Sequence, residues 1–205
     1  MFYLAHFATG FVLSFIGSLP LGMINMTVAD VTIHKSLRAG LWVALGAALV
    51  EMLQAFVALE FSGWWAGGGF WDQLIQWGAV VVFVVFGVYF LWKKPSSIEL
   101  EASEGSARTK HFFKGVLVSA LNLLAFPYWI FYGTYLANDG WLADVSLVSV
   151  FAFGVMAGTF VLLYFYARLS LSIVSRAQQF AWLTDRIIGV VFLFLAFVQL
   201  WRLLF

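Results

Sequence analysis

Glu51 is the residue of this chain whose position asks most directly for a chemical role. It lies near the middle of an apolar segment, Leu37 to Phe61, that is long enough to span a bilayer. Placing an acidic side chain at the centre of a membrane helix costs about 2.5 to 3.5 kcal/mol on insertion scales. Such residues usually face a bundle interior, a cavity or an ion path. We interpret Glu51 as part of a substrate or ion pathway, with a helix-packing hydrogen bond as the alternative.

Two proline–asparagine pairs could supply polar groups at the same depth. Pro20 and Pro127 lie inside apolar segments, where a proline removes a backbone donor and frees a carbonyl on the preceding turn. Freed backbone groups are tolerated there only where protein or a water-filled cavity takes them up. Asn25 follows the first proline and Asn122 precedes the second. Ordinary kinks and helix-to-helix hydrogen bonds are the alternative, but the occurrence of the pair in matching halves favours two broken helices.

Three more residues share this setting. Gln54 is one turn beyond Glu51 and shares its helix face. Gly22 follows Pro20 closely, and Thr159 falls near the position of Glu51 when the two halves of the chain are compared. The predicted substrate or ion pathway therefore consists of Pro20, Gly22, Asn25, Glu51, Gln54, Asn122, Pro127 and Thr159.

Groups suited to catalysis are not gathered in the interior. His6, His34 and His111 all lie near segment ends, so we expect no buried histidine–carboxylate or nucleophile–histidine set. One buried carboxylate offers few oxygen ligands to a hard cation, so no metal site is predicted. The absence of cysteine removes disulfides, thiolate metal ligands and thiol redox chemistry. We expect neither enzymatic activity nor a cofactor.

The composition requires membrane helices to hold these residues. Of the 205 residues, 63% are hydrophobic and 10% are charged, whereas about a quarter of a soluble domain is charged. At about 20 apolar residues per span, the chain has room for six helices and no separate soluble domain. We predict an all-α polytopic membrane protein with six spans, at Leu4–Val28, Leu37–Phe61, Phe70–Trp92, Phe112–Leu136, Val145–Ala167 and Ile187–Phe205.

Charged residues orient these spans. Alternate connections carry ten of the eleven Lys and Arg residues, and such connections face the cytoplasm. The other face carries Asp72, Asp139, Asp144 and the tryptophans of an interfacial belt. We therefore predict that both termini lie outside and that the loops Lys93–His111 and Arg168–Arg186 are cytoplasmic. With a formal net charge of +1 and no basic patch interleaved with aromatic residues outside the short loops, nucleic-acid binding is not expected.

The two halves of the chain look related. Gly10 to Ser14 comes before the first proline, and the similar run Gly115 to Ser119 comes before the second. Because each half has an odd number of spans, the second half enters the membrane from the opposite side, as in many secondary transporters. We predict an inverted 3+3 repeat, with residues 1–92 and 112–205 as the three-helix repeats and 93–111 as a cytoplasmic loop.

Small residues at helical spacing indicate close helix packing. The stripe in the first span consists of Gly10, Ser14, Ser18 and Gly22. A second stripe leads along the second span to Glu51, so we expect these two spans to pack together and bring Glu51 near the first break. Gly154 to Gly158 fits the same pattern; we predict packing inside the chain there, with a homodimer as the alternative.

Several of these motifs resemble one family. The first half resembles the opening of the LysE/RhtB family of amino-acid exporters in Ser18 to Asn25, Leu37 to Leu41 and Gly46 to Glu51. The second half resembles the corresponding start in Gly115, Ser119 and Asn122. The resemblance implies a six-helix inverted-repeat exporter of the bacterial cytoplasmic membrane. It would move amino acids or similar small solutes outward, driven by the proton or the membrane potential.

The resemblance also assigns positions. The family's Pro-rich first-helix motif maps onto Pro20 and Gly22, its acidic second-helix position onto Glu51, and its fourth-helix Asn-Pro onto Asn122. The chain departs from the pattern at Met23, where many members have a second proline, and after Asn122, where no proline follows directly. The partners implied are a small-molecule substrate and the lipid bilayer. A metal or ion exporter of the same superfamily and a non-transporting membrane scaffold are the alternatives.

Overall fold

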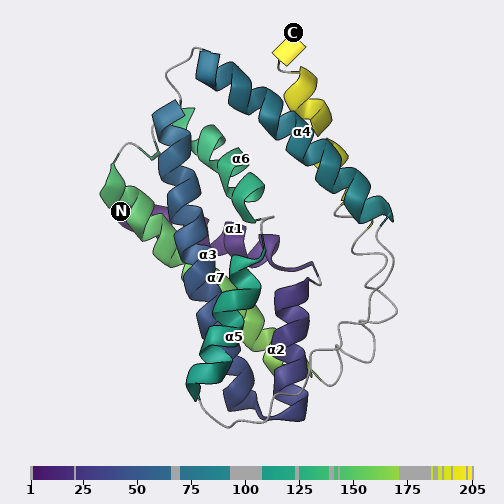
Figure 1. The fold of residues 1–205 in the computed structure, drawn as a ribbon. Coiled ribbons are helices and arrows are strands. Elements are labelled where there is room, and N and C mark those ends of the chain that lie inside the picture. The colour runs from purple at the N-terminus through teal and green to yellow at the C-terminus, as the bar shows by residue number, and fades with distance from the viewer. Residues whose placement is uncertain are drawn as a thin grey trace. The chain divides into compact units, whose positions relative to one another are not determined.

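The regular structure of the chain is α-helical (Figure 1). A computed structural model describes residues 2–20, 22–65, 70–92, 108–122, 125–138, 141–142, 144–170, 186, 189–190, 192–194, 196–201 and 203–204. The helices are α1 (Phe2–Gly17), α2 (Met23–His34), α3 (Leu37–Trp65), α4 (Phe70–Trp92), α5 (Arg108–Ala120), α6 (Ala125–Asn138) and α7 (Val145–Arg168). For the part of the chain described here, the predicted all-α class is confirmed.

Two helices are long and apolar enough to cross a membrane alone, counting the described residues. They are α3, over Leu37–Phe61, and α7, over Val145–Arg168. The pair α5 and α6 passes the same test as one span bent by 64°. Helix α4 has the bounds predicted for the third span, whereas the predicted sixth span is interrupted by residues outside the described part of the chain. The count of six spans stays a prediction.

The first and fourth predicted spans are each interrupted. Helix α1 ends at Gly17 and α2 begins at Met23, so the first break contains Pro20. The second break lies between α5 and α6 and contains Asn122. Pro127 is the third residue of α6, where its missing N–H removes no helical hydrogen bond. The second break therefore precedes its proline instead of surrounding it.

The helices divide into two compact units, each described by itself. One contains α1, α2, α3 as far as Gly63, α5, α6 and α7; the other contains α4 and the C-terminal segment. Each unit thus combines parts of both predicted halves. In the second unit, a Cβ on Gly87 would lie 2.7 Å from Leu193 Cδ2, and the rings of Phe83 and Phe192 are 5.8 Å apart. Helix α4 therefore packs closely on the C-terminal segment.

Glycines make the closest contact between α1 and α7. Gly154 and Gly158 lie against the carbonyl oxygens of Phe7 and Phe11, at a spacing that leaves no room for a Cβ. Gly10 lies equally close to the carbonyl of Phe151. The predicted internal use of the Gly154–Gly158 motif is confirmed. The expectation that Gly10 packs on the second span is wrong, because its partner is α7.

A matching contact joins α3 and α5. Gly46 lies against the carbonyl of Phe112, and Gly115 lies against the carbonyl of Val43. Because Gly115 was paired with Gly10 in the comparison of the halves, the two contacts correspond. The helix that opens each predicted half packs on the long helix of the other predicted half.

Candidate functional site

Side chains satisfy the backbone at the first break. Asn25 is buried at the start of α2, and its Nδ2 donates to the carbonyls of Ser18 and Pro20, both at 2.8 Å. The hydroxyl of Tyr166, on α7, donates to the carbonyl of Leu19 at 2.6 Å. Three consecutive carbonyls that a continuous helix would have used thus accept hydrogen bonds from side chains. The break is a defined structure held by α2 and α7.

Glu51 lies on α3 beside this break. Ser18 Oγ donates a long hydrogen bond, at 3.5 Å, to Glu51 Oε1. The hydroxyls of Thr159 and Ser14 also face the carboxyl group. These two are completely buried and hydrogen-bond each other at 2.6 Å. The carboxyl group therefore meets three hydroxyls, supplied by α7, by α1 and by the break itself.

A tyrosine of α6 fixes the end of α1. Tyr128 donates its hydroxyl to the carbonyl of Leu13 at 2.7 Å. Its ring occupies the place beside Gly17, where a Cβ would lie 2.6 Å from the tyrosine oxygen. The ring also packs on Tyr132 at a centroid distance of 4.9 Å. The start of α6, just after the second break, thereby braces the helix that leads into the first.

The second break meets α3 one turn after Glu51. Gln54 Nε2 donates to the carbonyl of Ser119 at 3.3 Å, and Ser119 Oγ donates to the carbonyl of Ala47 at 3.1 Å. The backbone N–H of Asn122 donates to the same Ser119 carbonyl at 3.0 Å. Gln54 is only 6% exposed, and its Oε1 has no partner among the described residues. A buried acceptor is thus open at this place.

The predicted pathway residues fall into two groups joined by α3. Around the first break lie Pro20, Gly22, Asn25, Glu51 and Thr159. At the second lie Gln54, Asn122 and Pro127. Asn25, Gln54 and Thr159 are buried, whereas Pro20 and Gly22 are exposed in the structure of this chain. That these residues line a pathway stays a prediction. The structure shows that the two groups lie beside neighbouring turns of α3, at Glu51 and at Gln54.

The sequence predicted Thr159 as a site residue, but it gave Ser14, Ser18 and the tyrosines no role in the site. Ser14 and Ser18 entered as small packing residues, and Ser18 also as part of a family motif, although their spacing of four is also that of two hydroxyls on one helix face. Tyr128 and Tyr166 carry no signal in the sequence, because an aromatic residue in an apolar helix is ordinary. Their hydroxyl partners lie more than a hundred positions away in the chain.

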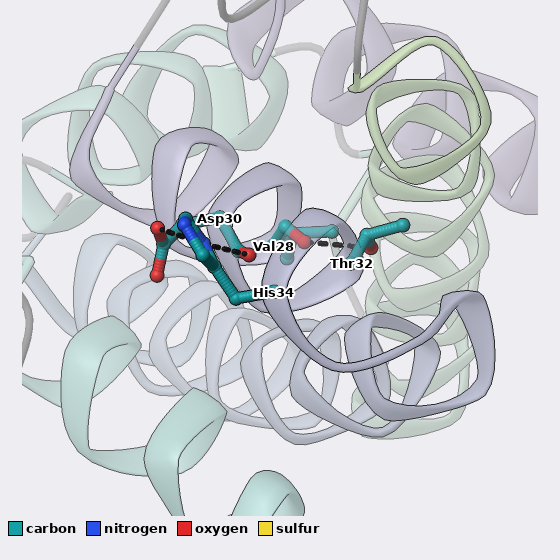
Figure 2. A network of polar contacts seen from close by, with 4 residues as sticks. All are labelled: Val28, Asp30, Thr32 and His34. Atoms are coloured by element: carbon teal, nitrogen blue, oxygen red, sulfur yellow. Dashed lines mark hydrogen bonds and ion pairs between the residues drawn. The ribbon is translucent and has the colours of Figure 1, made fainter. Parts of the chain in front are cut away.

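The histidines take no part in this site. His6 is 1% exposed, and its two ring nitrogens lie 2.8 Å from the Phe2 carbonyl and 2.7 Å from the Trp141 carbonyl. His34 Nδ1 lies 2.9 Å from a carboxylate oxygen of Asp30 on α2 (Figure 2). Among the described residues, the structure shows no other ion pair. Glu51 therefore has no basic partner in this part of the chain.

The arrangement suits small polar solutes and protons. A carboxyl group can release and take up a proton, and it can accept hydrogen bonds from an ammonium group. The hydroxyls beside it can donate or accept, and Gln54 adds an open acceptor. Within the described residues, no group of three or more His, Cys, Asp or Glu could hold a metal ion.

Comparison with known proteins gave one result. The family model described as LysE type translocator matches residues 15–202, a range that includes both breaks, Glu51 and Thr159. No curated protein and no solved structure matches the chain. The family identified from the sequence motifs is thereby confirmed.

Proposed function

Because the chain belongs to the LysE type translocator family, we propose that it is a secondary transporter that exports amino acids or related small solutes. The membrane is the bacterial cytoplasmic membrane, and the driving force is the proton gradient or the membrane potential. Family membership and the apolar helices α3 and α7 support the transport role. The kind of substrate, the outward direction of transport and the coupling to a driving force go beyond family membership and are proposed.

The observation that carries the coupling proposal is the position of Glu51. A group that couples transport to protons must sit inside the membrane segment and next to parts that can rearrange. Glu51 lies within the span Leu37–Phe61 and contacts the hydroxyl of Ser18 in the first break. The break is held by hydrogen bonds from Asn25 and Tyr166, which can be exchanged without unfolding a helix. Protonation of Glu51 would therefore change which hydrogen-bonding arrangement of this break is favoured.

The proposed substrate contacts follow from the open groups. In secondary transporters of this kind, substrates bind near the midplane where interrupted helices of both repeats meet. Here the two breaks flank Glu51 and Gln54 on one helix. The carboxyl group would accept hydrogen bonds from a substrate ammonium group, and Gln54 Oε1 would accept another. Asn25 would offer its amide when it leaves the break carbonyls.

The proposed orientation, with both termini outside, has support from the basic residues. Lys114, Lys35 and Lys110 all lie close enough to His111 to act on it electrostatically. Arg168, at the end of α7, lines the same cavity as Thr32 and Ile33, which lie at the end of α2. The basic ends of α2, α5 and α7 thus gather at one end of their unit (Figure 1). A common basic end is what the positive-inside rule requires of the cytoplasmic face.

Counterflow in proteoliposomes tests the transport proposal. Purified protein is reconstituted in vesicles loaded with one unlabelled amino acid, and uptake of the same radiolabelled amino acid is followed, with protein-free vesicles as control. We expect transient accumulation for one or more members of a panel of amino acids. A panel of divalent cations is tested in parallel. Accumulation of cations alone would show that the protein exports cations instead of amino acids. No counterflow with any solute would favour a non-transporting scaffold.

A further inference from the structure

A small cavity opens at the basic end of the first unit. Its volume is about 300 Å³, at the lower limit of the range of about 300 to 1,000 Å³ typical of small-molecule sites. It lies where the end of α2, the start of α3 and the end of α7 meet. Its lining residues are Thr32, Ile33, Leu37, Ala167, Arg168 and Ser170.

The polar groups of this cavity suit an anion. Among the described residues, Arg168 bonds Tyr164, with Nε donating to the tyrosine hydroxyl at 3.1 Å. Its two Nη groups are therefore open to a ligand, and a guanidinium presents them in the geometry of a phosphate. Ser170 is 4% exposed and lines the same cavity. Its hydroxyl can donate to an anion that the arginine beside it attracts.

The surrounding charge is positive. Lys35 and Arg38 lie within a few positions of Leu37, which lines the cavity. The acidic residue of α2, Asp30, is paired with His34, and Figure 2 shows this pair and Thr32 on different sides of the helix. The ends of α2 and α7 oppose an anion with about half a unit charge each, and the start of α3 favours it equally. The three helix ends together leave about half a negative charge, and the full positive charge of Arg168, which lines the cavity, outweighs it.

The apolar part of the lining distinguishes a lipid from a free ion. Ile33, Leu37 and Ala167 give half of the lining no hydrogen-bonding side chain. A free phosphate would leave this surface without a partner, whereas the glycerol and first acyl carbons of a lipid would cover it. Basic pockets at the cytoplasmic end of membrane helices are suited to anionic headgroups.

We propose that this cavity binds the phosphate of an anionic membrane lipid, with Arg168 and Ser170 as its hydrogen-bond donors. The site joins the ends of α2 and α7, and both helices hold the first break through Asn25 and Tyr166. The bound lipid would therefore brace the elements around Glu51. The inference rests on the membrane location of the chain and not on what it transports.

Native mass spectrometry of the purified full-length protein tests this site. The protein is titrated with phosphatidylglycerol or with phosphatidylcholine of the same acyl chains. We expect phosphatidylglycerol to bind about tenfold more tightly, a difference of about 1.4 kcal/mol. Arg168→Gln should abolish the preference, and Arg108→Gln, which removes an exposed charge outside the cavity, should keep it. An undiminished preference in Arg168→Gln would overturn the assignment.

Two further arms keep the test decisive. Ser170→Ala removes one donor without changing charge, so it should weaken phosphatidylglycerol binding about threefold and leave phosphatidylcholine binding unchanged. It serves in place of Arg168→Gln if that variant does not fold. Inorganic phosphate is added as a competitor. Displacement of phosphatidylglycerol by millimolar phosphate, with the same sensitivity to Ser170→Ala, would mean that the ligand is a soluble anion, and would refute the lipid proposal.

Discussion

Among single residues, the hydroxyls around Glu51 fall into two groups with different positions. Ser14 and Thr159 are buried and bonded to each other, and both face the carboxyl group. Ser18 belongs to the break and contacts the carboxyl group at the limit of hydrogen bonding. The paired hydroxyls therefore fix the surroundings of Glu51 on α1 and α7, whereas Ser18 joins it to the first break.

Thr159→Val tests this division. The substitution keeps the shape of the side chain but removes the hydroxyl that bonds Ser14 and faces Glu51. We expect a loss of about 1 kcal/mol in stability, with slower pH-driven uptake. Thermal unfolding in detergent and uptake by proteoliposomes measure the two effects. Ser149→Ala is the control on the same helix, because Ser149 bonds its own helix at the Val145 carbonyl. Equal behaviour of the two variants would remove Thr159 from the site.

His6 gives a second prediction at this scale. Both of its ring nitrogens lie within hydrogen-bond distance of a backbone carbonyl oxygen. His6→Phe keeps the ring contact with Trp141, at 4.7 Å between centroids, but removes both bonds. We expect a loss of about 1 to 3 kcal/mol. His34→Phe, at a largely exposed ion pair, should cost about 0 to 1 kcal/mol. Thermal unfolding that ranks the two in the reverse order would contradict this account.

At the scale of helices, close backbone contact decides which elements pack together. Gly154 and Gly158 admit the backbone of α1, and Gly46 and Gly115 bring α3 and α5 together. Such contacts are dense because no side chain separates the helices. They leave the hydroxyls of α1 and α7 close enough to bond each other.

Gly154→Ala should therefore be costly. Its new methyl group would overlap the carbonyl of Phe7, which belongs to the backbone and cannot turn away. We expect a loss of about 1 to 3 kcal/mol in thermal unfolding experiments. Gly78→Ala on α4 is the control, because nothing lies within 4 Å of the position its methyl group would take. That variant should be neutral or gain up to about 1 kcal/mol from helix propensity. Equal losses in both would argue against close packing of α1 on α7.

The sequence predicted the breaks better than the contacts between helices. Proline chemistry places the first break at Pro20, and the structure has it there. Proline is also permitted in the first turn of a helix, so Pro127 could not fix the second break to a residue. A stripe of small residues says that one face packs closely but not against which helix, and Gly10 was therefore assigned the wrong partner. The hydroxyl partners of Tyr128 and Tyr166 depend on the complete fold.

At the scale of the whole molecule, the proposed orientation makes a simple prediction. Ten of the eleven basic residues lie on alternate connections, so both termini should face outward. An alkaline phosphatase reporter, which is active only outside, should therefore be active when fused after Phe205. Fused at Arg38, next to the basic end of α2, it should be inactive. A reporter after Phe205 that behaves as cytoplasmic would refute the orientation and change the number of spans.

We propose that Glu51 carries the proton that drives transport. Glu51→Gln keeps the size of the side chain and most of its hydrogen bonding, but it cannot release a proton. Uptake into proteoliposomes is measured twice, once as exchange of substrate for substrate and once with an imposed pH difference. We predict that the variant exchanges substrate at a rate near that of the natural protein but fails to concentrate it with the pH difference. Normal pH-driven accumulation by Glu51→Gln would contradict the claim and leave Glu51 as a packing residue.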